Sequence, residues 1–268
     1  MSLQGGLASA FALESLFPRR LLANPRIPRW WQQLALLMIG SMLTRLCIPL
    51  AALSLAQLAH QNHWGLLHLG AVPFPASLII GVLVLDFSLY ALHRLFHGVP
   101  LLWRFHQVHH ADLDVDSGTS VRHHPGELLI AQACELAVIV IFGIEPLAVL
   151  LWLACLSVVD IFNHSNLALP DAVDRPLRWL IVTPDMHRIH HSTAFLESNR
   201  NFGNFLPWWD SLLSTYSCEP EGGQIHMNLG LAHLRSSDEL SLRKLLLLPF
   251  GPLGPADDGE TAGQRIAG

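Results

Sequence analysis

The chain has 268 residues, of which 51% are apolar and only 14% are charged. Because a typical globular domain carries about 25% charged residues, this composition excludes an ordinary water-soluble enzyme and a largely disordered chain. The net charge of −5 argues against a surface for nucleic acid, and the four cysteines lack the paired spacing of a disulfide framework or a zinc site.

The N-terminal part of the chain predicts an interfacial segment followed by a membrane helix. In residues 1–33, four arginines precede a pair of tryptophans, a pattern typical of the cytoplasmic face of a membrane. The apolar run at residues 34–59 reaches about 39 Å as one helix, enough to span a bilayer. Residues 60–75 contain no Lys or Arg, as expected on the far side, and residues 77–96 predict the returning helix.

Residues 128–162 hold two shorter apolar stretches, which predict a helical hairpin that either crosses the membrane or only enters it. The predicted fold class is an all-α integral membrane protein with about four transmembrane helices, two spans plus the hairpin, and a cytosolic helical cap. Both termini are expected in the cytoplasm. The chain divides into a cytosolic interfacial segment, a membrane-embedded domain and a C-terminal cap extension with a disordered tail from residue 251, at residues 1–33, 34–216 and 217–268.

Nine histidines recur at helical spacing near the predicted cytosolic ends of these apolar segments. They form one HxxxH box, two HxxHH boxes and a single histidine in an FNHSN segment, namely His93, His97, His106, His109, His110, His164, His187, His190 and His191. Positions i, i+3 and i+4 share one helix face, so each HxxHH box turns its imidazoles toward one point. Imidazole binds zinc, copper, iron and nickel, and nine ligands exceed one coordination sphere, which predicts two metal ions.

A nearly all-imidazole ligand set favours a redox metal that activates dioxygen over a hydrolytic centre, which is usually held partly by carboxylates. Carboxylates are then expected behind the histidines, where they orient each ring through its other nitrogen. The candidates for this role are Asp86, Asp112, Glu127, Asp160 and Asp185. Asp86 lies inside an apolar helix, where it either supports the metal centre or pairs with Arg45.

Several segments resemble the fatty acid hydroxylase/sterol desaturase superfamily, and their sequences are more similar to the sterol desaturase branch. They are HRLFH, HQVHH, RHHPGE, FNHSN, TPDMHRIHH, NRNFGN and PWWDSLLSTY, in this order within residues 26–216. The resemblance implies a non-haem di-iron oxygenase whose two iron ions are held by the nine histidines and are replaceable by zinc on purification. It also implies that the enzyme uses O2 and electrons to hydroxylate or desaturate a sterol, fatty acyl or related lipid. By the same resemblance, the electrons come from a separate donor, a cytochrome b5-like protein or a ferredoxin with its reductase.

Two questions stay open at this stage. Some members of the superfamily have a further histidine four residues before the one that matches His164, where this chain has Asp160. The tenth ligand is therefore Asp160, a water or His124. The alternative functions are a histidine-rich membrane metal transporter and a membrane cytochrome, but both place their ligands deep within the membrane, whereas these boxes lie near helix ends. We expect a multi-pass membrane enzyme with its active site on the cytoplasmic side.

Overall fold

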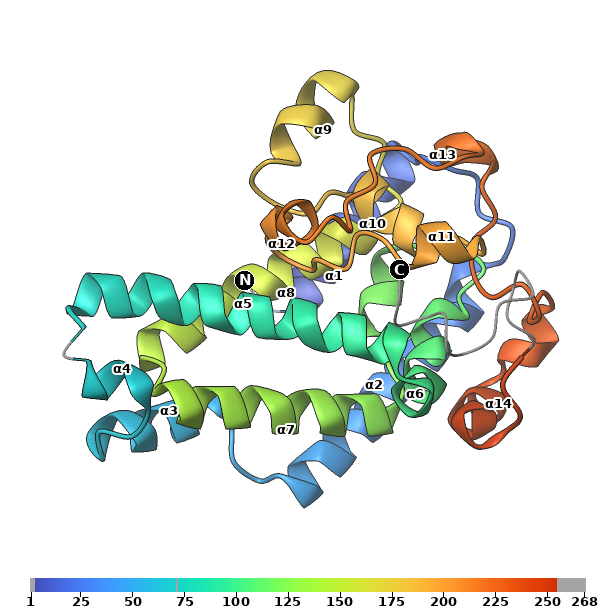
Figure 1. Cartoon of the computed structure of the whole chain (residues 1–268). Coiled ribbons are helices and arrows are strands. Elements are labelled where there is room, and N and C mark those ends of the chain that lie inside the picture. Colours follow the sequence, from blue (N-terminus) through green and yellow to red (C-terminus); the bar gives the residue numbers. More distant parts are fainter. Residues whose placement is uncertain (1–2, 71, 255–268) are drawn as a thin grey trace.

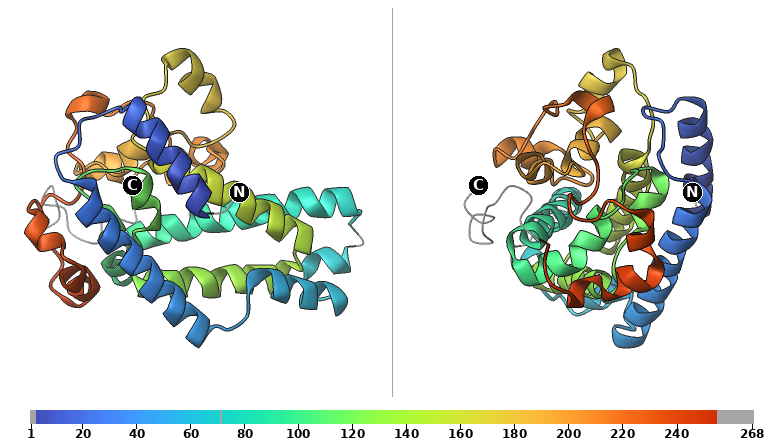
Figure 2. Two further views of the ribbon diagram at one scale, coloured as in Figure 1. Left: turned by 180° about the vertical axis from the view of Figure 1, so that it is seen from behind. Right: turned by 90° about the vertical axis from the view of Figure 1, so that its right-hand side faces the viewer.

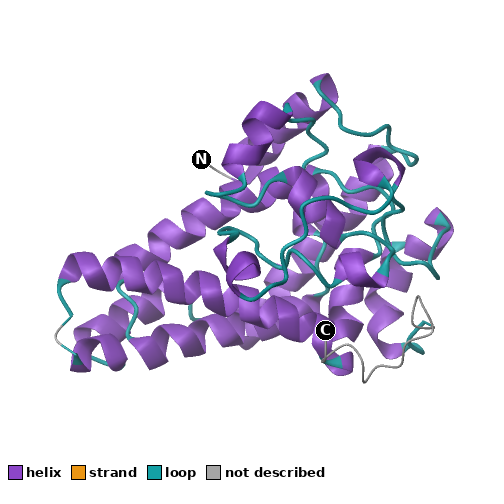
Figure 3. Cartoon of the chain, turned by 45° about the horizontal axis from the view of Figure 1, so that its top comes forward, coloured by secondary structure: helices purple, strands orange, loops and turns teal. Residues whose placement is uncertain are grey.

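In the computed structural model, which describes residues 3–70 and 72–254, the chain is helical, and these residues contain no β-strand longer than an isolated bridge (Figures 1 and 3). Within the described ranges, four stretches are long and apolar enough to cross a membrane, namely Arg26–Leu69, Phe74–Gly98, Pro125–Phe142 and Pro146–His164. The predicted all-helical membrane fold is therefore confirmed.

The first of these stretches is not one helix, which corrects the single span expected at residues 34–59. Helix α2 (Arg26–Cys47) ends just before Pro49, and α3 (Ala52–Gln61) begins just after it. Proline lacks an amide hydrogen and disfavours the helical conformation in the residue before it. Ile48 accordingly has φ −130° and ψ 81°, outside the helical region. The break turns the chain toward the short helix α4 (Leu66–Leu69).

Three long helices form the centre of the molecule: α5 (Phe74–Gly98), α7 (Pro125–Phe142) and α8 (Pro146–His164). Together with α3 they enclose an apolar core that includes Leu85, Ile139 and Trp152. The hairpin between α7 and α8 turns at Gly143, which has φ +66° and where a Cβ atom would clash with the carbonyl oxygen of Trp64.

The remaining short helices gather over one end of the long ones and form the cap (Figures 1 and 3). The cap elements are α6 (Pro100–His110), η1 (Ser117–Val121), α9 (Asp171–Leu177), α10 (Pro184–His190), α11 (Phe195–Ser198), α12 (Trp208–Leu212), α13 (Gly223–His226), η2 (Ser237–Leu240), α14 (Leu242–Leu247) and η3 (Leu248–Phe250). The predicted tail begins at residue 251, and most of it, residues 255–268, lies outside the described part of the chain.

The N-terminal segment packs against the cap through buried charges. Helix α1 (Leu3–Leu16) and α2 run across the back of the molecule (Figure 2). The guanidinium group of Arg29 in α2 lies 2.9 Å from the carboxylates of both Asp112 and Asp116. The carboxylate of Glu14 in α1 accepts hydrogen bonds from the backbone amide and hydroxyl of Ser117. These contacts fix the loop that follows α6, and thereby the end of α6 that carries histidines.

Candidate metal centre

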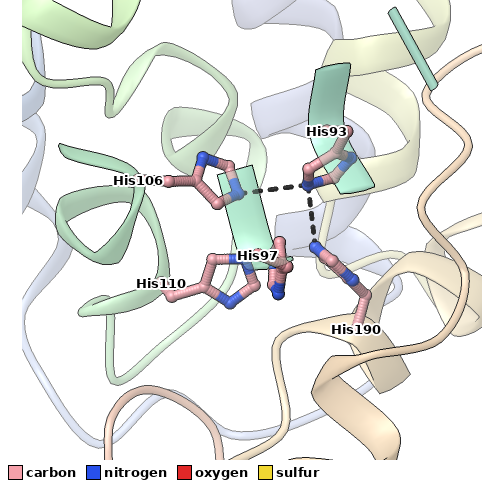
Figure 4. A group of neighbouring side chains, drawn as sticks. All are labelled: His93, His97, His106, His110 and His190. Atoms are coloured by element: carbon pink, nitrogen blue, oxygen red, sulfur yellow. Dashed lines mark hydrogen bonds between the residues drawn. The ribbon is translucent and has the colours of Figure 1, made fainter. Parts of the chain in front are cut away.

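The nine predicted histidines lie together in two adjacent groups between the long helices and the cap. In each group, one ring nitrogen per residue lies within 4.8 Å of the others, and every member is buried. The first histidine group is shown in Figure 4 and consists of His93, His97, His106, His110 and His190. The second histidine group consists of His109, His164, His187 and His191.

Helix geometry explains how each HxxHH box reaches both groups. Helix α6 supplies His106 and His110, one turn apart, to the first group, and His109 to the second. The box that begins in α10 does the reverse, with one histidine in the first group and two in the second. Pro100 starts α6 directly after α5 ends at Gly98, so the HxxxH box and the first HxxHH box meet at a tight corner.

In the first group, hydrogen bonds determine which ring nitrogen faces the centre. The Nδ1–H groups of His93 and His190 donate to carbonyl oxygens in the loop at residues 200–202, at 2.7 and 2.8 Å. The Nδ1–H of His106 donates to Glu127 at 2.7 Å. A neutral imidazole with its proton on Nδ1 has a lone pair on Nε2. Lone pairs therefore face each other: Nε2 of His93 lies 3.1 Å from Nε2 of His106 and 3.0 Å from Nε2 of His190 (Figure 4).

The second group has the same arrangement. Nδ1–H of His109 and of His164 each donates to a backbone carbonyl oxygen, at 3.3 and 2.8 Å. Their Nε2 atoms then face each other at 3.2 Å, and Nε2 of His187 lies 3.0 Å from that of His164. Both ring nitrogens of His191 are buried without a hydrogen-bond partner among the described residues. Converging lone pairs and unpaired buried nitrogens are unfavourable by themselves, and a cation in each group would satisfy them.

The ionisation of the histidines also suits a metal. Burial, reinforced by the neighbouring imidazoles, lowers the pKa of five histidines in the cap well below the ordinary value of 6.5; these are His109, His110, His187, His190 and His191. They are therefore neutral at physiological pH, and neutral imidazole is the form that binds a metal.

Among the predicted supporting carboxylates, Glu127 contacts the centre most closely. Its Oε1 atom accepts hydrogen bonds from Nδ1 of His106 at 2.7 Å and of His123 at 2.9 Å. His123 was not singled out in the sequence; its ring stacks on His109, with centroids 4.6 Å apart and an interplanar angle of 6°. Its i, i+4 spacing to Glu127 in the RHHPGE segment was the available signal. Asp160 lies behind His164, with its carboxylate 3.5 Å from Nδ1 of that ring.

The other three predicted carboxylates serve the fold: Asp112 pairs with Arg29, and Asp86 and Asp185 also bind groups other than the histidine rings. Asp86 accepts hydrogen bonds from two indole groups and one backbone amide, the shortest at 2.7 Å from Trp209 of the cap. These donors, and not Arg45, are its partners, because cap and bundle close around it. The carboxylate of Asp185 lies 2.8 Å from Arg19, which ties α10 to the N-terminal segment.

The structure places His124 outside both histidine groups, which corrects its inclusion among the candidates for a tenth ligand. Its Nδ1 accepts a hydrogen bond from the amide of Gly126 at 2.9 Å, and its Nε2–H donates to the carbonyl oxygen of Leu246 at 3.3 Å. His124 is thus the N-terminal cap of α7, and both of its ring nitrogens are already paired.

Fold and site together define a helical membrane protein with a histidine-rich candidate metal centre. Comparison with protein-family models identifies it further, because residues 78–215 match the fatty acid hydroxylase family. This match covers half of the chain, and the chain therefore belongs to that family, which confirms the resemblance seen in its histidine segments. No solved structure shows a significant match.

Curated relatives include three enzymes whose names refer to lipids. Ornithine lipid hydroxylase OlsE of Rhizobium tropici is 32% identical over 176 residues, which are 64% of this chain and 51% of the relative. Cholesterol 25-hydroxylase of Rattus norvegicus is 27% identical over 153 residues, 56% of this chain and 50% of the relative. Alkylglycerol monooxygenase of Homo sapiens is 28% identical over 149 residues, 54% of this chain and 31% of the relative. The chain thus spans about half the length of the first two relatives and about a third of the third.

Proposed function

We propose that this protein is a membrane-bound oxygenase that uses a di-iron centre, O2 and externally supplied electrons to hydroxylate or desaturate a lipid. The observation that carries the proposal is the convergence of Nε2 atoms from buried histidines in two adjacent groups. The number and type of these donors suit two cations of the kind that imidazole prefers. Membership of the fatty acid hydroxylase family, whose relatives include hydroxylases of an ornithine lipid and of cholesterol, supports a lipid substrate.

The first histidine group would hold one ion and the second histidine group the other. When bound, the metal pair supplies the redox chemistry needed to oxidise an unactivated C–H bond. The protein contributes the positions of the rings. Backbone carbonyl oxygens and Glu127 fix the Nδ1 protons, so that each Nε2 lone pair faces inward before the metal arrives.

Asp160 acts, in this proposal, from behind His164. Its carboxylate approaches Nδ1 of that ring, while Nε2 is the nitrogen that faces the second group. Asp160 would therefore strengthen His164 as a ligand through a carboxylate–histidine contact, and a water would complete the coordination.

A resident metal fits the site better than a transported one. The ring nitrogens are held in one tautomer by at least five hydrogen bonds to the protein. A transport site has to release its cargo, and is usually formed near the bilayer midplane by interrupted helices. The transporter alternative therefore finds no support in the way these rings are fixed.

The charge distribution supports a cytoplasmic cap with both termini on the same side. The arginines before α2 and in its first turn lie at the cap end, whereas residues 60–75, at the opposite end, contain no Lys or Arg. Electrons would then come from a cytoplasmic donor, either a cytochrome b5-like protein or a ferredoxin with its reductase.

The test is the metal content of detergent-purified protein expressed with iron-57, together with its Mössbauer spectrum. We expect two irons per chain with the signature of a coupled pair. His109→Ala and His190→Ala, one from each group, should lose metal and activity while still inserting into the membrane. A single metal in the wild-type protein, or normal activity in either variant, would contradict the proposal.

A further inference from the structure

Two cavities join the membrane-spanning helices to the histidines. The inner cavity, of about 170 Å³, is lined by members of both histidine groups, together with His123 and Glu127. The outer cavity, of about 410 Å³, lies between α2, α5, α7 and α8. Four apolar residues line both cavities and form a collar between them: Leu89, Leu128, Ala131 and Leu156. The two cavities are therefore neighbours, and this collar lies between the bundle side and the histidine side.

The outer cavity contains polar side chains although it is built from membrane-spanning helices. Four of these side chains form the polar cluster, which consists of Thr44, Arg45, Gln132 and Glu135. Polar and ionisable groups inside membrane helices are costly, and they usually face a cavity or a ligand path. The collar lies between the polar cluster and the histidines, so the polar cluster is separate from the candidate metal centre.

The hydrogen bonds of the polar cluster are incomplete. Gln132 donates from Nε2 to Oε2 of Glu135 at 3.3 Å. The other carboxylate oxygen, Oε1, and the hydroxyl of Thr44 are buried without a partner in the described part of the chain. An unpaired buried acceptor is unfavourable, and a donor from a bound molecule would satisfy it. Arg45 lines the same cavity and offers donors to an acceptor.

We propose that the polar cluster recognises a neutral donor–acceptor group of the lipid substrate, and that a secondary amide fits it. The amide N–H would donate to Oε1 of Glu135, and its carbonyl oxygen would accept from Arg45 or Thr44. The hydrocarbon beyond the amide then passes through the apolar collar to the inner cavity. This inference rests on the proposed function, because the bound lipid is the molecule that is oxidised at the histidines.

The arrangement also determines which part of the lipid is oxidised. Glu127 at the inner cavity and Glu135 at the outer cavity lie on the same helix, α7. Eight residues separate them, which corresponds to about 12 Å along a helix that rises 1.5 Å per residue. The reacting carbon would therefore lie about this distance from the amide, well along the chain and not next to the polar group.

The experiment compares two ligands that differ in one N–H. Radiolabelled N-butyl dodecanamide, a secondary amide, and N-butyl-N-methyl dodecanamide, its tertiary counterpart, are titrated onto the detergent-purified full chain with the metal it retains. We expect the wild-type protein to bind the secondary amide about tenfold more tightly, the effect of one hydrogen bond to a buried acceptor. Equal affinity for both amides would overturn the proposal.

Variants assign the preference to the polar cluster. Glu135→Leu should abolish the preference, whereas Glu145→Gln, a change of the carboxylate that lies 3.2 Å from His60 at the α7–α8 turn, should retain it. A preference that persists in Glu135→Leu would overturn the role of Glu135. Gel filtration establishes that each variant is folded.

A second readout needs no variant of Glu135. Cys134 also lines the outer cavity. In a chain whose other three cysteines are replaced by serine, the secondary amide should slow alkylation of Cys134 by N-ethylmaleimide, and an unchanged rate would overturn the proposal. Because neither readout requires turnover, a protein that shows the amide preference but lacks a di-iron centre would refute the proposed function and leave this recognition intact.

Discussion

Oε1 of Glu127 lies 2.7 Å from Nδ1 of His106 and 2.9 Å from Nδ1 of His123, so one buried carboxylate oxygen holds two imidazoles. The first of these rings belongs to the first histidine group, and the second stacks on His109 of the second histidine group. Glu127 thereby connects the two groups from behind. Its position at the start of α7 couples the geometry of the candidate metal centre to a membrane-spanning helix.

Removal of this carboxylate should weaken metal binding without unfolding the protein. For Glu127→Ala we expect a loss of about 10- to 100-fold in iron affinity, the usual effect of deleting a group that orients a ligand histidine. The measurement is iron retention during titration with a competing chelator. Asp171→Asn, which alters an exposed ion pair on α9, is the control and should behave as wild type. Wild-type affinity in Glu127→Ala would refute the orienting role.

Metal removal should destabilise the wild-type protein, because the converging Nε2 lone pairs then lack a cation. A ligand that binds only the folded state stabilises it by about 2.7 kcal/mol at a concentration 100 times its dissociation constant. The melting temperature in detergent should therefore fall on chelation and recover when iron is restored. His190→Ala should reduce this difference, whereas His226→Ala, a change of an exposed histidine outside both groups, should preserve it. An equal metal-dependent shift in both variants would exclude His190 as a ligand.

The ion pair between Arg29 and Asp112 predicts a pH dependence of stability. Burial alone would raise the pKa of Asp112, but Arg29 and Arg122 together lower it to about 2 in the folded protein, against an ordinary value of 3.8. A lowered carboxyl pKa contributes stability above the unfolded-state value, and this contribution is lost as the pH falls from 3.8 toward 2. This pH-dependent contribution to the free energy of unfolding amounts to about 2 kcal/mol.

The measurement compares chelated wild-type protein with Asp112→Asn in thermal melts from pH 6 to pH 2.5. Wild type should be the more stable protein at pH 6, and the difference should narrow in the acid range. Because Asp116 shares Arg29 with Asp112, the difference reports on these two carboxylates together. A difference that stays constant between pH 6 and pH 2.5 would show that the pair contributes nothing through ionisation.

Helical periodicity predicted that the nine histidines gather, but not how they divide: each HxxHH box was expected to face one point, and the structure divides each box between the two histidine groups. Within an HxxHH box, positions one turn apart share a face, and each box begins or ends next to an apolar segment. The break at Pro49 also has a signal in the sequence, namely the proline itself. The continuous hydropathy of residues 34–59 nevertheless predicts a single helix there. Proline within a long apolar run interrupts the helix, because it removes a backbone hydrogen bond and constrains the preceding residue.

The roles of the carboxylates were not predictable, because they depend on contacts between distant parts of the chain. Asp86 and its partner Trp209 are 123 residues apart, and no local pattern indicates that the cap closes over this carboxylate. Glu127 and Asp160 both lie near histidines in sequence, yet the first binds Nδ1 of a ring directly and the second lies farther from its ring. Only the packing of α7 and α8 distinguishes these cases.

The contact between Asp86 and Trp209 predicts how the cap is held on the membrane helices. Trp209→Phe keeps the ring but removes the indole N–H that donates to this buried carboxylate at 2.7 Å. Loss of one partner of a buried charged acceptor costs about 1–3 kcal/mol, so the melting temperature should fall while the metal content stays at the wild-type value. Trp208→Phe is the matched control, because that exposed indole donates to a backbone carbonyl oxygen of residue 179 at the surface. If both variants melted alike, the stability of the cap would depend on apolar packing of the ring and not on this hydrogen bond.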